Sequence, residues 1–267
     1  MNRTVLTHVL RQAVRTAVAL CVGTFAFFYL VLTASSSFLS QATFDIPFLR
    51  SPPRTMQALF GGSVDFLHAG GWLVIALAHP ITLALFTAAA LTAPGAIATE
   101  IERGTIDFVL SRPIRRRSYI LAVTTASLVL VTVAHLAALL AVLLARQTIS
   151  GVDDLSVSSL LRVVFGSWTV FAAVSLVAVL ICANASLRSR AVGLCVGFVV
   201  LSFLINVAAL MLDQLYALRR LSLFHYFQAT EVMDSTSRLR DLIVPAVIGV
   251  SALFAAVLSF SRRDIVR

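Results

Sequence analysis

The sequence predicts an all-α membrane protein with six transmembrane helices, preceded by an interfacial amphipathic helix. Hydrophobic residues make up 59% of the 267 residues and charged residues only 12%, and the mean hydropathy is +0.96. A soluble domain carries about 25% charged residues, so this chain has too little polar surface for a water-soluble fold. The apolar runs lack the alternation of a transmembrane β-strand, which disfavours a β-barrel.

Six apolar runs are long enough to cross a membrane as helices, which takes about 20 residues each. They lie at about residues 16–39, 72–93, 118–145, 160–184, 191–212 and 242–260. Residues 16–267 are therefore expected to form one six-span domain. His79-Pro80 predicts a kink within the second run, because proline leaves a backbone carbonyl without its donor.

The first 15 residues predict an amphipathic helix in the membrane interface. Leu6, Val9, Leu10 and Ala13 recur at helical spacing, while basic residues occupy other positions. The alternative is that this stretch extends the first span. Further along, residues 213–241 mix leucines and aromatics with arginines, which predicts short helices at the outer membrane surface.

Arginine sets the predicted orientation, because the chain contains no lysine. With six spans, both termini lie on one side together with the loops 94–117 and 185–190. That side holds 13 of the 21 basic residues, namely Arg3, Arg11, Arg15, Arg103, Arg112, Arg115, Arg116, Arg117, Arg188, Arg190, Arg262, Arg263 and Arg267. Arginine excess marks the cytoplasmic face, so both termini are expected in the cytoplasm, below the inner membrane of a bacterial cell. The net charge of +9 then reflects topology and not nucleic-acid binding.

The segment 94–117 after the second span carries the most specific pattern. Pro94-Gly95 is expected to interrupt the second helix at the membrane edge. Thr105 can cap a short helix with one apolar face, ended by Pro113. That face holds Ile106, Val109 and Leu110. Such a helix suits docking into a groove on a soluble partner; the alternative is a solvated loop with ordinary cytoplasmic arginines.

The same segment resembles the stretch that follows the second span in type-2 ABC transporter permeases. The similar residues are Glu100-Ile-Glu102-Arg103-Gly104-Thr105, then Asp107, Val109-Leu110-Ser111, Pro113 and Arg115–Arg117. That family also has six spans, an N-terminal interfacial helix and short outer helices before the sixth span, so the resemblance covers the whole chain. One departure is Ala122-Val123, which stand where members often carry a Gly-Lys pair.

The resemblance implies that this loop is a coupling helix that contacts an ATP-hydrolysing subunit. The implied coupling residues are Glu100 and Glu102 as charged anchors, Arg103 and Thr105 in the same motif, Gly104 as a tight turn, Ile106, Val109 and Leu110 as the docking face, and Pro113 as its end. The resemblance also implies two copies of an ABC ATPase subunit that bind ATP and Mg. A second permease subunit, in a homodimer or heterodimer, would complete the pathway.

The chain itself shows no catalytic, cofactor-binding or metal-binding pattern. It lacks a Gly-x-x-x-x-Gly-Lys-Ser/Thr phosphate loop, so ATP hydrolysis is assigned to the partner and the chain is not expected to be an enzyme. Among the few polar residues inside spans, His135 and Asn206 are candidates for a substrate pathway. No acidic residue lies in the middle of a span, which argues against an ion-coupled carrier.

An ABC exporter permease that moves a hydrophobic or amphiphilic molecule, such as a drug or lipid, is the leading hypothesis. The alternative is a secondary carrier or a membrane sensor subunit without transport. An intramembrane protease with Ser167 and His135 as a serine–histidine pair is a remote third hypothesis. No oxyanion-hole motif accompanies that pair, and a Gly-Ser pair in a membrane helix is usually a packing feature.

Overall fold

The computed structural model describes residues 3–40, 53–60, 66–106, 115–153, 155–233 and 236–263. The helices are α1 (Arg3–Ser40), α3 (Arg54–Leu59), α4 (Ala69–Ala78), α5 (Pro80–Glu102), α7 (Arg116–Thr148), α8 (Val157–Asn184), α9 (Arg188–Met211), η1 (Asp213–Leu221), η2 (Leu223–Tyr226), α10 (Ala229–Met233) and α11 (Leu239–Arg262). Six of them, α1, α5, α7, α8, α9 and α11, are long and apolar enough to cross a membrane. The prediction of an all-α protein with six spans is confirmed.

The second span differs from the prediction at both of its ends. The apolar run 72–93 is divided at His79, whose extended backbone separates α4 from α5. The His79 Nδ1 accepts a hydrogen bond from the backbone N–H of Ile81 at 3.1 Å, and Pro80 occupies the first helical position, where no N–H is needed. The membrane-length helix is therefore α5, which begins at Pro80 and continues to Glu102.

Pro94 does not end the helix, contrary to the expected interruption at the membrane edge. A proline at position 94 leaves the carbonyl of Ala90 without its usual donor four residues later. The Ser127 hydroxyl of α7 donates to that carbonyl at 2.9 Å. The Ser127 oxygen in turn lies 2.6 Å from the Ser175 oxygen of α8. Because a neighbouring helix replaces the missing hydrogen bond, α5 continues through the proline.

The N-terminal stretch is continuous with the first span. α1 runs from Arg3 to Ser40 without a break, so the separate interfacial helix expected over residues 1–15 is not seen and the alternative, an extended first span, fits the structure. Val5, Val9 and Ala13 are buried in the main core. The apolar face of this stretch therefore packs on the protein, which favours one continuous helix.

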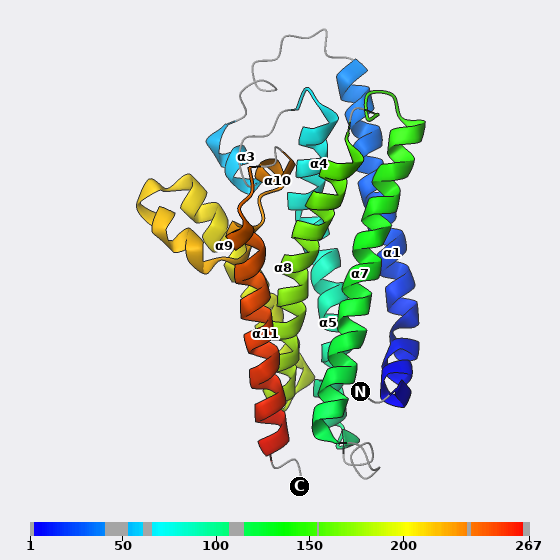
Figure 1. Cartoon of the computed structure of the whole chain (residues 1–267), viewed down its shortest axis with the longest axis vertical. Helices are drawn as coiled ribbons and strands as arrows, with labels where there is room; N and C mark the ends of the chain where they lie inside the picture. The colour runs from blue at the N-terminus through cyan, green and yellow to red at the C-terminus, as the bar shows by residue number, and fades with distance from the viewer. Residues whose placement is uncertain are drawn as a thin grey trace.

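The bundle has an inner group of helices flanked by more exposed ones (Figure 1). α5, α7 and α8 contact one another, α11 packs along α8, and α1 packs along α7. α9 contacts α5 and α8. Small residues allow the closest approaches: a Cβ added at Gly249 of α11 would lie 3.1 Å from the Cα of Ala173 in α8. Such small-residue contacts are typical of helix packing in lipid, where no hydrophobic effect drives helices together.

The ends of the elements gather at two ends of the bundle. α1 begins and α11 ends at the lower end of Figure 1, where α5 and α8 also end and α7 and α9 begin. We call this the terminal end. The opposite end holds α3, α4 and α10, and the segment with η1 projects sideways from the bundle. The short helices expected within residues 213–241 are thus η1, η2 and α10, and their place at a membrane surface stays a prediction.

Candidate coupling site at the terminal end

The C-terminal end of α5 turns sharply at Gly104. The backbone N–H of Arg103 donates to the Thr99 carbonyl at 3.0 Å, and that of Gly104 donates to the Ile101 carbonyl at 3.2 Å. Gly104 has a φ of 68°, a left-handed conformation that a glycine adopts without the strain of a side chain. The Thr105 hydroxyl donates to the Glu100 carbonyl at 3.3 Å. The chain is therefore reversed just after α5 by local hydrogen bonds and one glycine.

Two carboxylates at the end of α5 reach neighbouring helices. Glu100 accepts a hydrogen bond from the hydroxyl of Tyr119, near the start of α7, at 2.5 Å. Glu102 accepts one from the backbone N–H of Arg188, the first residue of α9, at 2.8 Å. A carboxylate at that position satisfies a free N–H group and complements the positive end of the helix dipole. The two glutamates thus join α5 to α7 and to α9.

A second set of contacts joins α7, α8 and α11 at the same end. The Nη1 of Arg263 donates to the Ala183 carbonyl at 2.8 Å and to the Ala185 carbonyl at 3.1 Å. Ala183 lies in the last turn of α8 and Ala185 caps that helix, where carbonyls have no partner within the helix. Arg116, at the start of α7, donates in turn to the Arg263 carbonyl. These hydrogen bonds therefore join the start of α7, the end of α8 and the end of α11.

The predicted coupling residues differ in exposure, and Glu100 is half-buried. Glu102, Arg103, Gly104 and Thr105 are exposed. Ile106 is only 1% exposed and belongs to the main core, so its side chain faces the protein's own interior and not a partner. Because the chain reverses direction at Gly104, the side chain of Ile106 can pack into the core of the bundle. Helical spacing alone does not predict this burial. Three further predicted residues lie outside the described part of the chain: Val109, Leu110 and Pro113.

A cavity of about 630 Å³ opens beside this loop, between the first part of α1 and the last part of α5. His8, Gln12 and Thr16 line it from α1, and Thr99 and Glu100 line it from α5. A Cβ added at Gly95, also in its wall, would meet no atom within 4 Å. The cavity has a polar wall next to apolar helix surface, the combination that suits an amphiphilic molecule.

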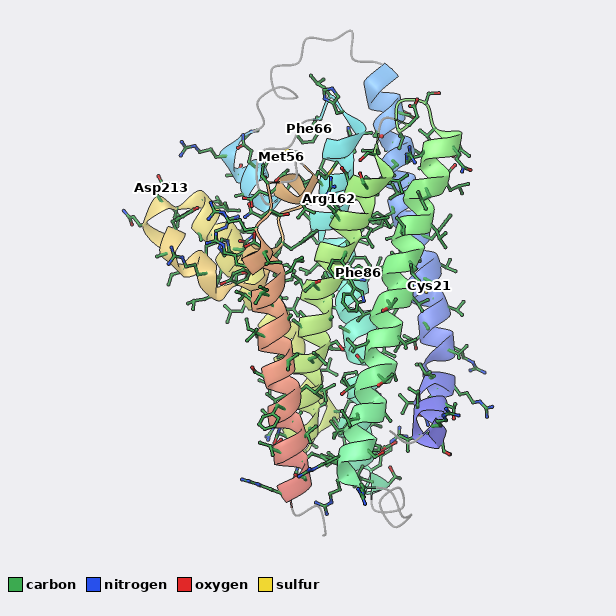
Figure 2. The ribbon with its side chains drawn as sticks, in the orientation of Figure 1. Cys21, Met56, Phe66, Phe86, Arg162 and Asp213 are labelled. Atoms are coloured by element: carbon green, nitrogen blue, oxygen red, sulfur yellow. The ribbon has the colours of Figure 1, made fainter. Side chains whose placement is uncertain are left out.

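His135 and Asn206, the residues predicted for a substrate pathway, do not line this cavity, and both are buried. The Nδ1 of His135 is 2.8 Å from the Val131 carbonyl, which can only accept, so Nδ1 bears the hydrogen. Nε2 then accepts from the Ser167 hydroxyl at 3.1 Å. The ring stacks on Phe86, with 3.9 Å between centroids, and Figure 2 shows Phe86 inside the bundle.

The surroundings of His135 leave no space for a substrate. The cavity that it lines has a volume of about 10 Å³, no more than the roughly 10–15 Å³ that a single water molecule needs. The contact between His135 and Ser167, which the protease hypothesis required, thus serves as a hydrogen bond between α7 and α8. Asn206 is different: its Oδ1 accepts from the Nε of Arg219 at 3.1 Å, a partner that sequence spacing did not indicate.

The sequence as a whole matches a family model described as ABC-2 family transporter protein, over residues 4–265. The chain belongs to this family. No curated protein and no solved structure shows a significant match to it. As an ABC-2 family transporter protein with six membrane-length helices, it is a multi-pass membrane permease of an ABC transporter, and permeases of this family generally work with an ABC ATPase. No group of three or more potential metal ligands occurs among the described residues.

The exposed glutamate-containing turn after α5 is the part of the chain that resembles a coupling segment. It lies at the same end of the bundle as the start of α1, the α8–α9 connection and the end of α11. The sequence pattern singles out Glu100 and Glu102 but does not indicate Tyr119, the partner of Glu100, or the contact of Arg116 with the Arg263 carbonyl. An aromatic residue and a basic residue at the start of a span are ordinary interface features, so neither provided a distinguishing signal.

Proposed function

We propose that the chain is the membrane-spanning permease subunit of an ATP-driven exporter and that it couples to its ATPase through the turn after α5. The observation that supports this most directly is the hydrogen bond from the Arg188 backbone to Glu102. Because of it, the exposed turn is attached to the first residue of α9 as well as to α5. A force applied to that turn by a partner acts on two membrane helices at once.

The bond between Glu100 and Tyr119 extends this connection to α7. α5 and α7 also share the Ser127 contact to the Ala90 carbonyl, and α7 reaches α11 through Arg116. Coupling through a protein needs elements that move as rigid units and contacts that join them. We infer that ATP and Mg bind in the partner, and that its closure displaces α5, α7 and α9 together at their terminal ends.

The transported molecule is proposed to be hydrophobic or amphiphilic, such as a drug or lipid. The cavity between α1 and α5 supports this, because polar and apolar side chains line it together: Gln12 and Glu100 beside Val9, Ala13 and Ala96. An amphiphile can place its polar group against the polar side chains and its apolar part against the apolar ones.

The proposed assembly has two ATPase subunits and a second permease, as a homodimer or heterodimer. Exposed apolar side chains on α9 and α11 support a membrane-embedded surface that is available to lipid and to a second permease; Leu194 and Leu201 on α9 are 62% and 60% exposed, and Phe254 on α11 is 66% exposed. The arginine distribution supports termini in the cytoplasm of a bacterium, with the ATPase below the inner membrane.

The test is to isolate the tagged permease from its native membrane, identify any co-purifying ATPase, and reconstitute both in proteoliposomes. Glu102→Gln removes the charge at the start of α9, and Glu102→Lys reverses it. We expect both to leave the fold intact, to weaken ATPase recovery, and to lower the ATPase rate stimulated by the permease, with the larger effect for lysine. Asp153→Asn, an exposed acid at the opposite end, is the matched control. Wild-type permease that purifies without an ATPase, or equal rates in all variants, would refute the proposal.

A further inference from the structure

A second polar cavity lies at the opposite end of the molecule, away from the coupling site. It has a volume of about 310 Å³, and η1, η2, α10 and the first turn of α11 surround it. Its charged and titratable lining consists of Arg219, Arg238, Arg240, Glu231, Asp241 and His225. Three of these six are arginines, so positive charge predominates in its wall.

Arg219 is an unusual residue for this position because it is 95% buried: only 5% of its surface is exposed. Its Nε donates to Asn206, and its guanidinium lies 6.0 Å from the centre of the Tyr216 ring. Its Nη2 is buried and has no hydrogen-bond partner. A buried guanidinium nitrogen without an acceptor is strongly unfavourable, so a structure that keeps one is expected to supply an acceptor from outside the chain.

His225, in the lining of the same cavity, also has a ring nitrogen without a hydrogen-bond partner. This nitrogen is Nδ1, and it is buried. Burial lowers the pKa of the ring below its ordinary value, and the charges of Arg219, Arg240 and Arg220 lower it further, while Asp241 opposes them. Two buried nitrogens without hydrogen-bond partners therefore belong to the lining of one cavity. In the tautomer with its hydrogen on Nδ1, the neutral His225 ring can donate to an acceptor there.

The acidic residues of the cavity do not satisfy these nitrogens. Both oxygens of Asp241 are engaged, one with the Arg238 backbone N–H at 2.9 Å and the other with the Nε of Arg240 at 3.4 Å. Glu231 lines the cavity but makes no ion pair with another described residue. The described lining thus has three guanidinium groups against two carboxylates, one of which is already occupied.

We propose that this cavity binds a phosphate-type anion, held by Arg219 with help from Arg238 and His225. Guanidinium groups match the oxygens of phosphate with paired, charge-assisted hydrogen bonds. The anion has two possible sources, free phosphate or the headgroup of an anionic phospholipid. Leu221 and Leu239 next to the cavity are 74% and 73% exposed, which provides an apolar surface for acyl chains. The site does not depend on the ATPase.

The test uses the full chain, purified in detergent and in lipid nanodiscs. Inorganic phosphate is titrated into the detergent sample by calorimetry, and nanodiscs of phosphatidylglycerol or phosphatidylcholine are compared by the lipid retained in native mass spectrometry. Arg219→Gln is expected to reduce binding roughly tenfold or more, the loss of one charge-assisted hydrogen bond. Arg238→Gln, at an exposed position, tests the site without altering a buried residue. Arg162→Gln is the matched control, since Arg162 is exposed and does not line the cavity. Figure 2 shows Arg162 in the same half of the molecule.

Each outcome decides between the sources or against the site. Saturable binding of phosphate in detergent, lost in the Arg219 and Arg238 variants and kept in the Arg162 variant, supports a free anion. Retention of phosphatidylglycerol only, with the same pattern among variants, supports a headgroup. Absence of both, or equal binding by all three variants, overturns the proposal whatever the result of the ATPase experiment.

Discussion

The replacement of a missing backbone hydrogen bond by Ser127 can be tested by a double-mutant cycle. Ser127→Ala removes the donor to the Ala90 carbonyl and also the acceptor for the Ser175 hydroxyl. Pro94 prevents the backbone from satisfying that carbonyl, so it stays unpaired in a buried site. An unsatisfied buried group costs about 1–3 kcal/mol, while hydrogen bonds between membrane helices average about 0.6 kcal/mol. We therefore expect Ser127→Ala to lower the free energy of unfolding by about 1–2 kcal/mol.

The second step of the cycle restores the backbone donor. In Pro94→Ala, the new N–H lies in a helical position from which it can donate to the Ala90 carbonyl, so Ser127→Ala should cost less in that background. Ser175→Ala removes only the contact between hydroxyls and is the control. Unfolding in detergent with increasing denaturant gives the four free energies. A penalty for Ser127→Ala that is the same with proline or alanine at position 94 would refute the reasoning, because the two changes would then be independent.

Two further predictions concern packing and charge. Gly249→Ala should lower the free energy of unfolding by about 1–3 kcal/mol, because the added Cβ would lie 3.1 Å from the backbone of Ala173. Gly197→Ala is the control and should leave the free energy of unfolding unchanged, because no atom lies within 4 Å of its added Cβ. Equal unfolding midpoints for the two variants would contradict the close packing at Gly249. For His225, a pKa below its ordinary value means that the folded protein resists protonation, so stability should fall as the pH drops through about 6.5. His225→Gln should reduce that dependence, measured by thermal unfolding between pH 5 and 8, and an unchanged profile would argue against it.

The sequence predicted the elements that depend on local composition. A membrane helix is specified by its own apolar length, so the spans were identified with ends correct to within a few residues, apart from the second and the extended beginning of the first. The end of the second span differs from the prediction because the effect of Pro94 depends on Ser127, which is 33 positions away in the chain. Whether a proline breaks a helix in a membrane is decided by a neighbouring helix and not by the local pattern.

The candidate site shows the same division between local and distant information. Gly104 was identified from a short motif, and its left-handed backbone is a local property. Ile106 was placed on a docking face from spacing alone, whereas its burial depends on where the chain goes after the turn. The pairing of Arg219 with Asn206 crosses from η1 to α9. An arginine in a segment rich in arginines has no pattern that separates a buried side chain from a solvated one.

These distant contacts hold α9 at both of its ends. Glu102 binds its first backbone N–H, while Ser202 accepts from the Ser222 hydroxyl and from the Leu223 backbone N–H, at 2.7 and 2.9 Å. Asn206 adds the bond to Arg219. A helix of 24 residues is a stiff rod about 36 Å long, so its two ends cannot move independently. We therefore expect a displacement of the turn after α5 to move the whole of α9. The hydrogen bonds of Ser202 and Asn206 then determine whether η1 and η2, which line the second cavity, move with it.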